Sequence, residues 1–296
     1  MFGILNVNKP PGWTSRDALN RVEGLVRPLK AGHAGTLDPL AKGVLVVCVG
    51  AATRLIDYVQ QMPKEYAATF LLGRRSASED VDTEVELMVD APRPTREAIE
   101  AAVPRFVGRI EQRPPAFSAV KVEGRRSYRL ARRGDVVEHA ARAVEVFRLA
   151  VVRYEYPELE LEFSCSSGTY VRSLGRDLAE SLGTHAVMSA LMRTAVGGFR
   201  IEDAMDARGP DLDRLLRYLQ SPLAAVPQMP RLVLTDEQVF EVQHGGLIKG
   251  DALPAELQGV TSEAIAAIDE RGEMIALLKE VRPGWWKPSP NLLQTG

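Results

Sequence analysis

"GHAGTLDPLAKGVLVVCVG", residues 32–50, joins a glycine-rich turn to an unbroken apolar run. Residues 44–49 are all apolar and mostly β-branched, with a glycine on each side, which predicts a central strand buried on both faces. In the turn before it, the glycines permit backbone conformations closed to other residues, and Pro39 keeps Asp38 out of the helical region. In this segment Asp38 either caps a turn, as Asp-Pro often does, or is held rigidly at a strand edge for chemistry.

The rest of the chain mixes strands with amphipathic helices, which predicts an α+β fold. Expected strands cover 3–8, 66–72 and the alternating run 158–166; expected helices follow Thr14 or Ser15 and the turn 166–169. The segment 203–225 has a helical, connecting character. After residue 230 the pattern changes to short strands with turn signals, including a hairpin at 269–272. We expect one large domain over 1–228 and a small β domain over 229–296.

Composition narrows the class of protein. The chain has 296 residues, of which 45% are hydrophobic and 26% charged, as in ordinary soluble globular proteins. It contains no apolar run of the roughly 20 residues that cross a bilayer, and no signal peptide is recognisable. Cys48 and Cys165 lie in apolar runs, which is typical of free thiols in a reducing cytoplasm. The four histidines are scattered without metal-ligand spacing, so we expect no metal.

Positive charge is concentrated in one segment, although the net charge is only −2. Residues 104–142 contain ten Lys and Arg against four Asp and Glu. A basic face of this kind suits phosphate binding, and a solvated helix face is the alternative. The candidates for contact with the phosphates of a nucleic-acid backbone are Lys121, Arg125, Arg126, Arg129, Arg132 and Arg133.

Three further side chains are candidates for chemistry beside Asp38. Arg172 falls in the first turn of a predicted helix and off its apolar stripe; a guanidinium beside a partly buried aspartate favours the ionised form. An ionised carboxylate suits a nucleophile better than a general acid. Tyr66 and Tyr170 can stack on an unpaired base, although core packing is the commoner fate of a single tyrosine. We find no second carboxylate in a setting like that of Asp38, which argues against a glycosidase pair.

Five segments, in order over about residues 1–200, together resemble the TruB family of tRNA pseudouridine synthases. They are GILNVNKPPGWTS, GHAGTLDPLAKGVLVVCVGAATR, KEYAATFLLG, RPPAFSAVKVEGRRSYRLARRG, and CSSGTYVRSLGRDLAESLG with ALMRTAVGGF. The C-terminal segment is similar to a PUA domain, a small RNA-binding β-barrel. The resemblance implies a catalytic domain on a mixed, largely antiparallel sheet flanked by helices. It also implies an RNA-binding, thumb-like insertion at about 104–142.

The resemblance also implies roles for single residues. Asp38 matches the nucleophile, Arg172 its partner, and Tyr66 the side chain that stacks on the base and handles the C5 proton. His33 matches the side chain that enters the RNA fold. Tyr170 and Leu191 match residues that line the uridine pocket.

Two positions depart from the family pattern. Asp80 aligns with an acidic loop residue, but the usual TDTSDxDG has become SASEDVDT, so no role is assigned to Asp80. LMR replaces the common LRR and removes one arginine near the pocket.

The function implied by the resemblance is conversion of uridine 55 in the T arm of tRNA to pseudouridine. The uridine must be flipped out of the RNA, and the rearrangement needs no cofactor, metal or protein partner. We expect a cytoplasmic monomer. The alternatives are a guide-RNA-dependent relative and a tRNA-binding or tRNA-folding protein without catalysis.

Overall fold

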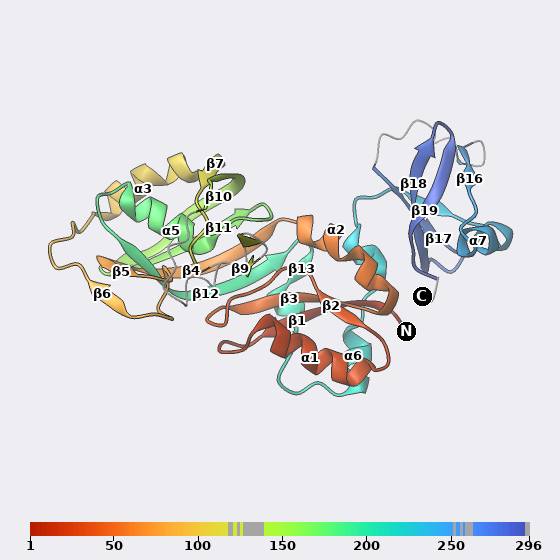
Figure 1. The fold of residues 1–296 in the computed structure, drawn as a ribbon, viewed down its shortest axis with the longest axis horizontal. Helices are drawn as coiled ribbons and strands as arrows, with labels where there is room; N and C mark the ends of the chain where they lie inside the picture. Colours follow the sequence, from red (N-terminus) through yellow and green to blue (C-terminus); the bar gives the residue numbers. More distant parts are fainter. Residues whose placement is uncertain are drawn as a thin grey trace.

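The computed structural model describes residues 1–117, 139–250, 253–254, 257 and 263–293, and the backbone of 121–122 and 125–126. Figure 1 shows a long sheet with helices packed along it, and a smaller sheet set to one side near the N-terminus. The fold is α+β, as the alternation of strand and helix patterns predicts. Within the described residues, no helix is long and apolar enough to span a membrane.

The long sheet has ten strands and is mixed, with mostly antiparallel pairing. Its main path runs β14 (Met205–Asp206), β1 (Gly3–Lys9), β3 (Lys42–Val49), β12 (Ala186–Val196), β4 (Lys64–Leu72), β11 (Glu158–Cys165), β10 (Arg142–Glu155) and β7 (Gly108–Gln112). Off this path, β2 (Ala31–His33) pairs with β3, and β13 (Phe199–Arg200) pairs with β12. Only the β1–β14 and β3–β12 pairs are parallel.

Strand β3 has the central, doubly buried position that its sequence predicts. Every residue from Gly43 to Val49 is buried. Alternate side chains enter two different cores: Val44 and Val46 pack in one, and Leu45 and Val47 in the other. A strand covered on both faces therefore carries the turn that holds Asp38.

The helices pack on both faces of this sheet. They are α1 (Ser15–Val26), α2 (Ile56–Gln61), α3 (Arg96–Ala102), α5 (Val171–Glu180) and α6 (Leu212–Tyr218), with 3-10 turns at Gly50–Leu55, Val103–Phe106, Ile201–Asp203 and Pro222–Ala225. A further helix, α7 (Asp236–Gln243), packs on the smaller sheet instead. Thr14 caps α1, and its capping box with Asp17 satisfies the free amides of the first turn. Leu174 and Leu178 of α5 pack on the core formed by β4 and β11.

The segment 203–225 differs from the expected helical connection. It contains α6, but it also contains the two-residue strand β14, whose Met205 pairs in parallel with Val7 of β1. Two residues are too few to produce an alternation that a sequence pattern can reveal.

The C-terminal part forms a separate five-stranded sheet. Its order is β15 (Arg231–Val233), β17 (Ile265–Ile268), β18 (Met274–Arg282), β19 (Trp285–Asn291) and β16 (Ile248–Lys249). The predicted hairpin at 269–272 is present between β17 and β18. Among the described strands the path is open, with β15 and β16 at its ends.

Two small hairpins complete the described strands. Strands β5 (Arg74–Ser76) and β6 (Val85–Leu87) pair beyond the end of β4, and β8 (Lys121–Val122) pairs with β9 (Arg125–Arg126) in the basic segment.

Candidate active site

The Asp38 turn is fixed by contacts from the N-terminal segment. Ser15 Oγ donates to the Leu37 carbonyl at 3.1 Å and accepts from the Leu37 amide at 2.8 Å. The Gly12 amide donates to the Pro39 carbonyl at 2.8 Å, so both neighbours of Asp38 are held by hydrogen bonds. The Asp38 side chain itself stays 38% exposed. The turn thus presents one carboxylate on a rigid backbone, open to a ligand.

Arg172 lies beside Asp38 and joins it to a second carboxylate. One guanidinium nitrogen is 3.1 Å from Asp38 Oδ2, and the other is 3.5 Å from Asp80 Oδ2. The same two nitrogens donate to the carbonyls of Ser78, at 2.8 Å, and Phe117, at 3.0 Å. The Arg172 side chain is only 8% exposed, so these four acceptors replace its water. The guanidinium is held in one orientation toward Asp38.

Asp80, to which the sequence assigned no role, belongs to this site. Its side chain is 3% exposed, accepts the Asp82 amide at 3.0 Å and the Ser78 hydroxyl, and pairs with Arg172. The Asp80 backbone bridges to Met188 of β12, which fixes the loop between β5 and β6 against the sheet. Arg172 therefore lies between two carboxylates, those of Asp38 and Asp80. In the sequence, the role of Asp80 is indicated only by an acidic residue in a loop whose motif has otherwise changed.

Tyr66 lies on β4 and on the sheet face that α5 covers. Its ring stacks on Phe163 with centroids 5.3 Å apart, and Leu191 belongs to the same core. Burial raises the pKa of the Tyr66 hydroxyl. The positive charge of Arg193 lowers this pKa, and the nearby Asp38 raises it further. The phenol is therefore neutral in the free protein and remains half-buried at the site.

His33 lies at the end of β2, and Tyr170 directly precedes α5. Burial, followed by the charge of Arg193, lowers the pKa of the His33 imidazole, so that the neutral form is favoured. Tyr170 is the residue before the first turn of α5, and its amide donates to the buried Gln112 side chain at 3.0 Å. The Tyr170 backbone is thereby tied to β7, next to the start of the basic segment.

Three buried cations near Tyr66 and Asp38 were missed by the sequence reasoning: Lys9, Lys64 and Arg193. Burial lowers the pKa of both lysines to about 8. Among the described residues, no carboxylate forms a salt bridge with any of the three. For Arg193, the signal was a lone arginine inside the apolar run AVMSALMRTAV.

The candidate RNA contacts of the basic segment are only partly within the described structure. The backbone of Lys121, Arg125 and Arg126 lies in the β8–β9 hairpin. Arg129, Arg132 and Arg133 lie outside the described residues.

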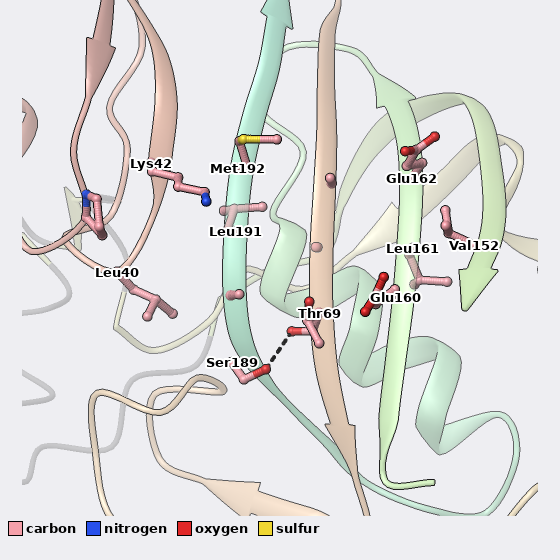
Figure 2. A pocket seen from close by; sticks show the side chains of 14 residues that line it. Leu40, Lys42, Thr69, Val152, Glu160, Leu161, Glu162, Ser189, Leu191 and Met192 are labelled. Atoms are coloured by element: carbon pink, nitrogen blue, oxygen red, sulfur yellow. Dashed lines mark hydrogen bonds between the residues drawn. The ribbon is translucent and has the colours of Figure 1, made fainter. Parts of the chain in front are cut away.

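Two cavities lie close to the site, and neither is lined by Asp38, Tyr66 or Arg172. The smaller, about 420 Å³, lies over β12, β4 and β11 and includes Leu191 and Leu40 (Figure 2). Its lining combines Ala68, Leu161 and Leu191 of the α5-side core with Thr69 and Glu160 from alternate strand positions. The larger, about 1050 Å³, lies along the β5–β6 hairpin and includes Glu79.

Comparison with known proteins identifies the family. Residues 23–171 match the sequence profile described as "TruB family pseudouridylate synthase (N terminal domain)". The chain belongs to the TruB family of pseudouridylate synthases. This TruB-family chain is 39% identical to tRNA pseudouridine synthase B of Arthrobacter sp., over 97% of this chain and 95% of that protein. It is 37% identical to the protein of the same name from Moorella thermoacetica, over 94% of each. Family membership makes the chain an isomerase.

Solved structures show the same fold. The structure described as "Crystal Structure of a Cbf5-Nop10-Gar1 Complex" covers all of the TruB-family chain and 82% of its own, with a TM-score of 0.72 and 26% identity. "Structure of H/ACA RNP bound to a substrate RNA containing 2'-deoxyuridine" covers 94% and 78%, with a TM-score of 0.70 and 25% identity. In the part of the chain that is described, no group of three or more His, Cys, Asp or Glu is placed to hold a metal ion.

Proposed function

We propose that this enzyme converts uridine 55 in the T arm of tRNA to pseudouridine, acting alone as a cytoplasmic monomer. One observation carries the proposal. A TruB-family chain presents the accessible carboxylate of Asp38 3.1 Å from the buried Arg172 guanidinium and beside the half-buried Tyr66. The relatives with matching length are named tRNA pseudouridine synthase B, which supports tRNA as the substrate.

The reaction is an isomerisation in which atoms and charge balance within the nucleotide. The C1′–N1 bond breaks, the uracil rotates, and a C1′–C5 bond forms. N1 gains one proton and C5 loses one, so no redox partner or energy source is required. The rigid turn and the exposure of Asp38 are compatible with attack at C6, attack at C1′, or assistance of elimination at C2′.

In this proposal each neighbour of Asp38 has a physical task. Arg172 pairs with Asp38 and orients it, and Asp80 holds Arg172 from the other side. Tyr66 stacks on the flipped base, and Leu191 and Tyr170 line the space that the base enters. The cost of flipping the uridine, a few kcal/mol, is offset by stacking and pocket contacts. His33 fills the position that the extruded base leaves, for which a neutral imidazole suits stacking better than a charged one.

Binding of the rest of the tRNA is proposed for two surfaces. One is the basic segment that contains β8 and β9. The other is the C-terminal sheet, which we propose as a PUA-like module. There, the Trp285 ring lies 4.4 Å from the Arg282 guanidinium carbon and 5.5 Å from Lys249 Nζ. Cations around a half-exposed ring suit phosphates and an unpaired base.

The test is release of tritium from tRNA transcripts that carry 5-tritiated uridine, with the purified protein alone. We expect one equivalent per tRNA, and none from a transcript with cytidine at position 55. The guide-RNA alternative instead predicts release only after a guide RNA is added. The binding-protein alternative predicts tRNA affinity without any release, and either result would overturn the proposal.

The role of Asp38 is tested with a matched pair of variants. Asp38→Asn is expected to abolish tritium release while tRNA affinity stays within about threefold, since the amide keeps the shape but is no nucleophile. Asp57→Asn, at an exposed carboxylate on α2, is the control and should keep full turnover. Normal turnover by Asp38→Asn would place the nucleophile elsewhere.

A further inference from the structure

Arg193 is the largest side chain that is fully buried, at 2% exposure. From β12 it donates to the Val44 carbonyl at 2.7 Å and to the Gly35 carbonyl at 3.2 Å. These two bonds connect β12 to β3 and to the glycine turn that carries Asp38. A guanidinium has five donors, and two main-chain carbonyls leave part of that capacity for other groups.

On its other side Arg193 faces Tyr66. The two residues are directly opposite each other on the antiparallel strands β12 and β4, so their side chains share one face of the sheet. The guanidinium interacts with the Tyr66 hydroxyl. Arg193 is therefore the group that connects the Asp38 turn to the tyrosine.

The positive charge of Arg193 has no structural partner of opposite sign. Among the described residues, no carboxylate forms a salt bridge with it, and its charged or titratable neighbours are Lys9, Lys64, His33, Cys165 and Tyr66. Burying an unpaired charge is costly, and two carbonyls can be satisfied by a neutral donor. A purely structural tie does not explain the charge.

We propose that Arg193 is a positioning residue that acts through Tyr66, holding the phenol oxygen and stabilising its phenolate form when Tyr66 takes the C5 proton. After the C1′–C5 bond forms, C5 carries both the sugar and a hydrogen. The Tyr66 phenolate, formed by loss of its proton to solvent, accepts this hydrogen as a proton. The C5–H electron pair returns to the ring as the C5=C6 double bond, and N1 takes a proton from solvent. This step rests on the proposed function.

The surroundings of Tyr66 support this assignment. Burial disfavours the phenolate, as do the nearby Asp38 and Cys165, and all three raise the Tyr66 pKa. Arg193 is the group that acts in the opposite direction. An opposite charge within about 4–6 Å typically shifts a pKa by about 1–3 units. Without Arg193, the phenolate would be scarcer.

The experiment measures the ionisation of Tyr66 in the free protein. The full chain is labelled with trifluorotyrosine, which ionises well below tyrosine, and Tyr66→Phe identifies the Tyr66 resonance in ¹⁹F NMR spectra. We expect Arg193→Met and Arg193→Gln to raise the Tyr66 pKa by about one unit or more, because both remove the charge. Arg193→Lys keeps the charge and should restore most of the shift. Lys64→Met removes a different buried cation, which contacts the Gln60 carbonyl, and should change the Tyr66 pKa by less than a third as much.

A second measurement separates positioning from general damage. In single-turnover tritium release, Arg193→Gln should be slower than wild type by about tenfold at pH 7, and the deficit should shrink as the pH rises. Affinity for tRNA should stay within about threefold. An equal loss at every pH, an unchanged Tyr66 pKa in Arg193→Gln, or a wild-type Tyr66 that stays protonated until the protein unfolds would each overturn the proposal. Because the titration needs no RNA, its result is independent of whether tRNA is the substrate.

Discussion

Arg172→Lys preserves a positive charge beside Asp38 and removes the geometry around it. In the structure, two nitrogens of one planar group serve four acceptors: two carboxylates and the carbonyls of Ser78 and Phe117. A lysine has one nitrogen and cannot reach both Asp38 and Asp80 at once. The substitution therefore tests whether the site needs only a positive charge beside Asp38 or one group that pairs with both Asp38 and Asp80.

The expected loss of stability follows from the burial of each partner. Asp80 is 3% exposed, and removing the partner of a buried charge costs about 3–5 kcal/mol. Asp38 is 38% exposed, so its pairing contributes at most about 1 kcal/mol. Because lysine keeps a charge in the neighbourhood, we expect the lower end, a loss of about 3 kcal/mol. Turnover should fall about a hundredfold, since a carboxylate displaced by about 1 Å loses its alignment with the nucleotide.

Urea unfolding and single-turnover tritium release measure the two effects. The matched control is Arg176→Lys, one turn further along α5, where the arginine also binds two acids, Glu79 and Asp177. Its side chain is more exposed and does not contact Asp38, so we expect a loss of about 1 kcal/mol and normal turnover. If Arg172→Lys stays within threefold of wild-type turnover, or loses no more stability than Arg176→Lys, the bridging argument is wrong.

Three further predictions address other parts of the molecule. Folding lowers the pKa of His33, so the unfolded chain binds the proton first as the pH falls through 6.5. The free energy of unfolding therefore decreases as the pH falls, and His33→Phe should make this decrease smaller between pH 7.5 and about 5.5 in urea titrations. Gly43→Ala should lower the free energy of unfolding by more than about 3 kcal/mol in thermal unfolding, because φ is +106° and an added Cβ would lie 2.2 Å from the Arg193 carbonyl oxygen. The control Gly12→Ala, at φ +83° with open space around it, should lower it by about 1 kcal/mol. The logarithm of tRNA affinity should fall linearly with the logarithm of salt concentration. In a filter-binding series, Arg125→Ala and Arg126→Ala should reduce the slope by about 0.7–0.9 for each phosphate that is no longer neutralised. An unchanged slope would indicate that these arginines lie on a solvated face and do not contact phosphate.

The sequence predicted those parts of the fold that are decided by neighbouring residues. The continuous apolar run of β3 and the strict alternation of β11 each report burial directly, and Thr14 with Asp17 marks the start of α1. The strand β14 was missed because its two residues are defined only by pairing with β1. Its existence depends on a distant segment, which local patterns do not contain.

The residues of the candidate site likewise differ in how far neighbouring residues in the sequence predict them. Asp38 and Arg172 stand out by residue type within recognisable segments, so their pairing was a natural expectation. Asp80 did not stand out, because its role depends on the backbone bridge to Met188 that places the loop beside α5. Arg193 was likewise hidden, since its position opposite Tyr66 is set by the register of β12 on β4. Register across strands distant in sequence is a tertiary property.

The charges around Asp38 favour an anionic ligand at this position. Lys9, Lys64, Arg172 and Arg193 are all buried. Among the described residues, Asp38 and Asp80 pair with Arg172, Asp17 and Glu79 lie nearby, and no carboxylate forms a salt bridge with the other three cations. With pKa values of about 8, both lysines are largely protonated at pH 7, so burial carries an uncompensated positive charge into the fold. A protein that only needed to be stable would gain by replacing these cations with apolar side chains of similar volume. A nucleotide phosphate, or a uracil that carries the electron pair of its broken glycosidic bond, supplies the missing negative charge. Under the proposed function, these buried cations stabilise the negative charge that develops during the reaction.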